Sequence, residues 1–148
     1  MTQRLKAHLN GENENPPVKT ITTAEFKAVA TKTALKYKLT INEVDGLTQA
    51  HIHLGESDER GAPVAFLYGP SAPTGNLYKV VLKGVLTADD LIGPLKGKPF
   101  SKLLEEIDQG NTYVGVHTRK HPFSAVRGQI ETECEKKKDV FFFFFSEL

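Results

Sequence analysis

The chain has 148 residues, of which 39% are hydrophobic and 25% are charged, a composition typical of one soluble globular domain. It carries 19 basic and 18 acidic residues, so its net charge of +1 gives no basic surface and we expect no nucleic-acid partner. The single cysteine, Cys134, excludes an internal disulfide and a multi-cysteine zinc site within one chain.

The N-terminal residues, MTQRLKAHLNGENENPP, become polar too early to contain the apolar segment of a signal peptide. We therefore expect either a cytoplasmic protein or a chain from which a leader is missing. The sequence also lacks a run of about 18 apolar residues, so we expect no transmembrane helix.

Most of the chain alternates between apolar and polar residues, which is the pattern of half-buried strands. The first such segment covers residues 4–10 and is followed by a proline-containing loop at 11–18. Residues 19–30 and 33–44 are separated by a short polar turn and are predicted to form a hairpin. Further strands are predicted at 48–55, 64–67, 77–87, 111–118 and 124–131.

Two short helices are predicted between residues 87 and 109. Thr87 is a suitable N-cap for the segment 88–95, and Ser101 is a suitable N-cap for a second helix that Gly110 would end. The frequent short strands and turns predict an all-β fold, an antiparallel Greek-key sandwich or barrel, with one or two short helices inserted around 87–109.

The alternation also predicts which side chains fill the core, because successive residues of a strand point to opposite faces. The apolar residues of the strands at 48–55, 111–118 and 124–131 are assigned to the inner face. They are Ala50, Ile52, Leu54, Val114, Val116 and Ile130.

Three histidines fall on the opposite face of these strands. His51 and His53 alternate with the apolar residues of TQAHIHLG, and His117 alternates with the valines of TYVGVHT. Two histidines at i and i+2 lie roughly 6 to 7 Å apart along a strand, which lets both rings reach one ion. Neutral imidazole is a common ligand of copper and zinc, so we predict a Cu or Zn site at His51, His53 and His117. Solvated surface histidines are the alternative.

Three further residues are candidates near this site. His8 in the first strand and His121 in the turn after His117 are candidate additional metal ligands, each with a surface histidine as the alternative. Arg127 is predicted to point outward, close to His117 across a hairpin. There it could neutralise an anion or pair with Glu131 in a surface salt bridge.

Three separated motifs resemble the CHRD domain family, which is named after chordin and is also found in stand-alone bacterial and archaeal proteins. The motifs are LNGENENPPV at 9–18, GLTQAHIHLGESDERGAPVAFLY at 46–68 and GNTYVGVHTRKHPFSAVRGQI at 110–130. The resemblance covers roughly residues 4–131, with the motifs in the family's order and spacing. The chain departs from the family pattern at Asn15, where an apolar residue is usual, and at Ala125, where a glutamate is usual.

The resemblance implies a β-sandwich module, mostly extracellular or envelope-associated, without an established catalytic activity. We therefore expect a non-enzymatic module that binds a transition metal, or a partner protein, at its histidine face. A redox enzyme is the main alternative, because His-x-His followed by a later Val-His is similar in layout to the copper/zinc superoxide dismutases. A structural interaction domain with incidental histidines is the third. The protein partner and any oligomer stay open.

The C-terminal residues differ from the rest of the chain. A charged cluster is followed by five consecutive phenylalanines, Phe141–Phe145, which have no strand or helix period and would be prone to aggregate if exposed. We divide the chain into a CHRD-like domain at 1–132 and a non-family tail at 133–148. A docked terminal strand or an oligomer contact is the alternative for the tail.

Overall fold

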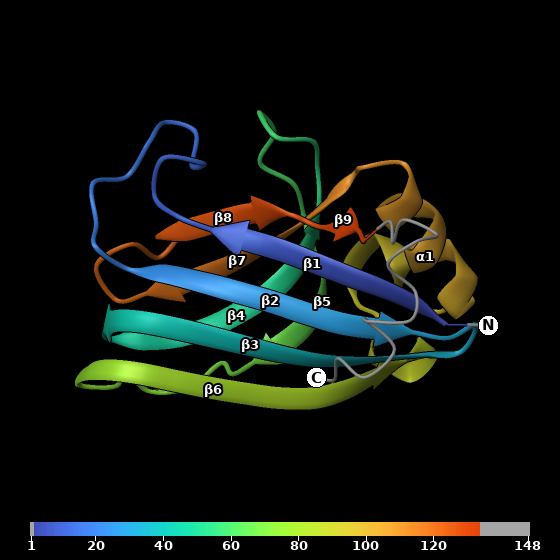
Figure 1. Ribbon diagram of the computed structural model, residues 1–148, viewed down its shortest axis with the longest axis horizontal. Coiled ribbons are helices and arrows are strands. Elements are labelled where there is room, and N and C mark those ends of the chain that lie inside the picture. The colour runs from blue at the N-terminus through green and yellow to red at the C-terminus, as the bar shows by residue number, and fades with distance from the viewer. Residues whose placement is uncertain (1, 134–148) are drawn as a thin grey trace, which may run out of the picture.

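The alternating segments of the sequence fold into two antiparallel sheets in the computed structural model, which describes residues 2–133 (Figure 1). One sheet has five strands in the order β6-β3-β2-β1-β9, and the other has four in the order β5-β4-β7-β8. The strands are β1 (Gln3–Leu9), β2 (Thr23–Ala30), β3 (Ala34–Asp45), β4 (Leu47–Leu54), β5 (Pro63–Tyr68), β6 (Asn76–Thr87), β7 (Thr112–Thr118), β8 (Val126–Gln129) and β9 (Glu131–Thr132). The predicted all-β sandwich is confirmed.

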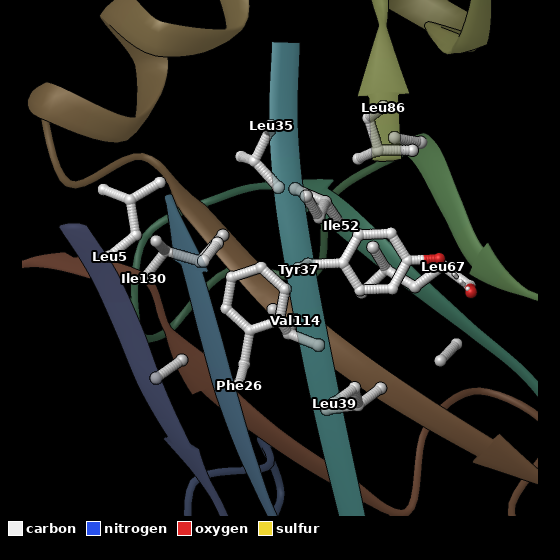
Figure 2. Packing of buried hydrophobic residues seen from close by; sticks show 14 of the residues in the cluster. Leu5, Phe26, Leu35, Tyr37, Leu39, Ile52, Leu67, Leu86, Val114 and Ile130 are labelled. Atoms are coloured by element: carbon white, nitrogen blue, oxygen red, sulfur yellow. Dashed lines mark hydrogen bonds between the residues drawn. The ribbon is translucent and has the colours of Figure 1, made fainter. Parts of the chain in front are cut away.

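The core lies between the two sheets and is built from alternate residues of each strand. In β2 and β3 the pairs Phe26–Leu39 and Ala28–Tyr37 stand opposite each other, and all four side chains are buried. Figure 2 shows Phe26 and Tyr37 in the same part of the core as Val114 and Ile52, with the Tyr37 ring extending toward Leu67. The Tyr37 hydroxyl donates a hydrogen bond of 2.6 Å to the carbonyl of Leu67 in β5, which joins the two sheets inside the core.

The predicted core set is largely confirmed. Ala50, Ile52, Val114 and Val116 are fully buried, and Ile130 is buried as well. Leu54 is only partly buried and packs against the rim of the core, because it is the last residue of β4. The strand register therefore has the face assignment expected from the alternation.

The helical region differs from the prediction in two ways. Residues 88–95 form two 3₁₀ turns, η1 (Ala88–Asp90) and η2 (Gly93–Leu95), instead of one helix, since Gly93 and Pro94 interrupt it. Thr87 does begin the first turn, and its backbone N–H donates to the Asp90 carboxylate at 2.8 Å. The second helix, α1 (Phe100–Asp108), has Pro99 at its N-cap, so the assignment of that role to Ser101 is wrong.

The two sheets approach each other closely where β8 continues into β9. β8 pairs with β7 in one sheet, and β9 pairs with β1 in the other. At this crossing Asn10 and Arg127 exchange backbone hydrogen bonds of 3.3 and 3.2 Å. A Cβ on Gly128 would lie 2.1 Å from the carbonyl oxygen of His8, so only glycine allows this approach.

Two loops project from one edge of the sandwich. In Figure 1 the loop after β1 and the loop after β4 both project above β8, whereas α1 lies at the end of the sandwich near the N-terminus. Among residues 2–133 no helix has the length and apolar character needed to cross a membrane. The phenylalanine run and the proposed tail lie outside the described residues, except for Glu133, whose N–H donates to the Arg4 carbonyl at 2.9 Å.

Candidate metal centre

The three predicted histidines come together because β4 and β7 are neighbouring strands. In this pair His51 stands opposite Gly115, His53 opposite Tyr113, and His117 opposite Gln49. All three side chains therefore project from the same face of the four-stranded sheet, the face away from the core. Their ligand nitrogens lie within 4.8 Å of one another, and no other group of this kind is found among residues 2–133.

The cluster is buried, although it lies on the outer face of its sheet. His51, His53 and His117 are only 5%, 6% and 5% exposed. Two loops cover them: the Gly61 carbonyl oxygen lies 3.1 Å from His53 Nδ1, and the Pro122 carbonyl oxygen lies 2.8 Å from His117 Nδ1. The sequence predicts the correct face, but the alternation of a strand contains no information about loops that fold over it.

These contacts determine which ring nitrogens carry protons. A carbonyl oxygen only accepts hydrogen bonds, so Nδ1 of His53 and Nδ1 of His117 must each donate a proton to it. His51 Nε2 lies 3.1 Å from Gln49 Oε1 and donates in the same way. In the neutral rings the remaining nitrogens, His51 Nδ1, His53 Nε2 and His117 Nε2, therefore carry lone pairs.

His117 Nε2 lies close to the lone-pair nitrogen of each of the other two rings. His117 Nε2 lies 3.2 Å from His51 Nδ1 and 3.3 Å from His53 Nε2. Two nitrogens bound to one ion in tetrahedral geometry, each at about 2.0–2.1 Å, are about 3.3 Å apart. Lone pairs that face each other without a proton repel, and a bound cation would remove that repulsion. The donor set and the two distances to His117 Nε2 fit a zinc or copper ion.

The cluster also resists protonation. Burial, followed by the charges of His117 and His53, lowers the pKa of His51 from 6.5 to about 3. Burial is likewise the largest cause that lowers the pKa of His53 to about 4, and it lowers the pKa of His117. At neutral pH all three rings are neutral, which is the form that binds a metal.

Aromatic side chains hold two of the imidazoles in place. The Tyr113 ring stacks on His53 with centroids 4.7 Å apart and planes at 7°, and the Phe66 ring meets His51 edge-on at 4.6 Å. With the ring nitrogens hydrogen-bonded as well, the orientation of each imidazole is fixed by the protein itself.

Arg127 lies beside this cluster in a role that differs from the predicted surface salt bridge. Its side chain is only 3% exposed, and its guanidinium lies over the Tyr113 ring, 3.5 Å from the centroid. It donates to the carbonyls of Glu56 and Glu59, and to Gln129 Oε1, instead of pairing with Glu131. Arg127 therefore supports the ring that stacks on His53 and fixes the loop that covers it.

The structure does not bring His8 and His121 into the cluster. His8 is exposed at the other sheet, where its Nδ1 contacts the Glu25 carboxylate. His121 is partly exposed in the loop after β7, and its backbone N–H donates to Thr118 Oγ1 at 3.0 Å.

Glu14 and Ser124 are two residues near the cluster that the sequence reasoning missed. The Ser124 hydroxyl hydrogen-bonds the Glu14 carboxylate, although the two residues are 110 positions apart in the chain. Both residues belong to motifs quoted above, GENENPP and HPFSAVRG, and the polar residues of those motifs were the available signal.

The fold and this cluster define an all-β sandwich with a buried three-histidine centre. The family model of the CHRD domain matches residues 5–130, and the chain belongs to the CHRD domain family. No curated protein and no solved structure matches the chain.

Proposed function

We propose that this CHRD domain binds one Cu(II) or Zn(II) ion through His51 Nδ1, His53 Nε2 and His117 Nε2, and that it acts as a non-enzymatic metal-binding module. The observation that carries the proposal is the convergence of three lone pairs, with nitrogens 3.2 and 3.3 Å apart. Neutral nitrogen ligands favour copper over other divalent first-row ions in intrinsic affinity.

The binding module is favoured over the dismutase-like alternative by the covering of the site. A redox enzyme for a small anion needs an open route to the metal and a field that attracts the anion. Here the three rings are nearly inaccessible, and the net charge of the chain is only +1.

Calorimetric titration of metal-free, untagged protein with copper and with zinc tests the proposal. We expect one site per chain in the wild type and a loss of at least about 100-fold in affinity in the double variant His51→Ala, His117→Ala. The double variant His8→Ala, His121→Ala removes the same number of histidines outside the cluster and should leave the affinity unchanged. Equal affinity of the two double variants would exclude this site.

A further inference from the structure

The Ser124 hydroxyl lies over Gly115, on the same side of the backbone as the metal-facing nitrogen of His53. Gly115 has no side chain to fill this space. A Cβ placed on Gly115 would lie 3.3 Å from His53 Nε2 and 3.3 Å from Ser124 Oγ. The hydroxyl oxygen and the metal-facing nitrogen therefore lie over the same glycine.

Ser124 takes this position with an unusual backbone. Its φ is 140°, a region that residues other than glycine seldom occupy. The Ser124 N–H donates to the His121 carbonyl at 3.2 Å. The chain rejoins the sheet at the next residue, where the Ala125 N–H donates to the Val116 carbonyl at 2.8 Å. Ser124 therefore has an unfavourable backbone conformation at the position where its hydroxyl lies over Gly115.

Glu14 is the partner of this hydroxyl. Its carboxylate is half-buried, and its hydrogen-bond partner is Ser124 Oγ. Burial raises the pKa of Glu14, while the Ser124 hydrogen bond and the charges of Arg127 and Arg60 oppose that rise. The loop after β1 therefore places an acidic side chain against Ser124, on the covered face of the sheet.

The proton of the Ser124 hydroxyl is used in a hydrogen bond to a neighbouring oxygen and is not available to the histidines. Its two oxygen neighbours are the Glu14 carboxylate and the Val126 carbonyl at 3.1 Å, and a carbonyl can only accept. If Glu14 is ionised, both neighbours are acceptors and one of them takes the proton. If Glu14 is protonated, it donates to Ser124, and Ser124 donates to Val126. In both cases Ser124 Oγ can offer only a lone pair toward the histidines.

We propose that Ser124, held by Glu14, is a hydrogen-bond acceptor near the metal-facing nitrogen of His53, and that with a metal bound this acceptor would favour a further ligand carrying a proton, such as water, over an aprotic anion. The inference rests on the proposed metal site and adds a determinant of what completes the coordination. A water molecule can donate to Ser124 Oγ, whereas an anion without a proton places its charge against a lone pair and a nearby carboxylate. Ser124 and Glu14 are positioning residues in this arrangement.

Azide is the probe, because it carries no proton and its binding to Cu(II) gives a visible charge-transfer band. Copper-loaded wild type, Ser124→Ala, Glu14→Gln and the control Glu12→Gln are each titrated with azide. Glu12 is exposed in the same loop and is not among the hydrogen-bond partners of Ser124, so its variant removes an equal charge without altering the pair. We expect azide to bind about tenfold more tightly to Ser124→Ala and to Glu14→Gln, and unchanged to the control.

The copper spectrum before azide separates the two proposals. Wild type that takes up no copper at the histidines would refute the metal site and this inference with it. If all four proteins bind copper and the bound copper has the same azide affinity in each, the acceptor pair alone is overturned. The same holds if azide affinity rises in Glu12→Gln as much as in Ser124→Ala and Glu14→Gln. If Ser124→Ala fails to fold, Glu14→Gln decides the question, since it keeps the serine and its backbone.

Discussion

Each imidazole of the cluster uses its two nitrogens for different purposes. One nitrogen donates to an oxygen of the protein, from Gln49, Gly61 or Pro122, and the other faces the shared centre. The facing nitrogen is Nδ1 in His51 and Nε2 in the other two rings. This mixed set follows from the contacts of each ring, and it means that the metal-free protein already has the tautomers that an ion requires.

The burial of these rings predicts a dependence of stability on pH in the metal-free protein. Above pH 6.5 the rings are neutral in both the folded and the unfolded chain and have no effect. As the pH falls below 6.5, the unfolded chain takes up protons that the folded chain accepts only near pH 4 at His53 and near pH 3 at His51. The free energy of unfolding should therefore decrease between about pH 6.5 and 3.

Urea denaturation of metal-free protein at several pH values between 7 and 4 measures this effect. The difference between wild type and His51→Gln isolates the contribution of one ring, because carboxyl groups titrate in both proteins. His8→Gln changes an exposed histidine and serves as the control. A wild type that loses no more stability than His51→Gln across this range would show that the rings are not shielded from protons.

At the scale of elements, the centre depends on how loops are fastened to the four-stranded sheet. Arg127 in β8 donates to two carbonyls of the loop after β4 and lies over Tyr113 in β7. The same loop provides the Gly61 carbonyl that orients His53. Arg127 thus links β8 and β7 to the loop that orients His53.

Arg127→Lys keeps the charge but removes the planar guanidinium, which can bond two carbonyls and stack on a ring at once. We expect the free energy of unfolding to fall by about 1.5–3 kcal/mol, as for lost hydrogen bonds to a buried charged group. Metal affinity should fall as well, because the loop that orients His53 is no longer fixed. Arg119→Lys, in an exposed position, should change neither quantity. Unaltered stability in Arg127→Lys would mean that the loop is held by other contacts.

Strand alternation is the part of the structure that the sequence predicts well. It assigns Ile52 and Val114 to the core and His51 and His117 to the other face, because face depends only on position along a strand. The covering of the cluster and the meeting of Glu14 with Ser124 depend on contacts between distant loops, which have no periodic signature. The sequence does not predict the burial of Arg127 for the same reason: an arginine on the outer face of a strand has the pattern of a surface residue.

At the scale of the whole molecule, the described sandwich is complete without the phenylalanine run. The family match ends at residue 130, and the last strand, β9, ends at Thr132. We expect deletion of residues 134–148 to change the free energy of unfolding by less than about 1 kcal/mol, because this leaves intact every strand within residues 2–133. Removal of five phenylalanines should also increase solubility.

Thermal denaturation and the solubility limit of the truncated chain test this prediction beside the full-length protein. Replacing Phe141–Phe145 with serine in the full-length chain is the matched control, since it changes composition without changing length. A truncated protein that unfolds, or that melts well below the full chain, would place the phenylalanines in the folded core and shift our domain boundary.

The concealment of the three imidazoles has a consequence for rates as well as for affinity. An ion can reach nitrogens that are 5–6% exposed only when the loops carrying Gly61 and Pro122 separate. Arg60 of the first loop lies over the ring of Phe123 in the second, 5.3 Å from its centroid, and this contact must break in the same motion. Uptake and release would then proceed at the pace of loop opening. If the domain binds a metal as proposed, slow opening would let it keep the ion after the surrounding supply has fallen.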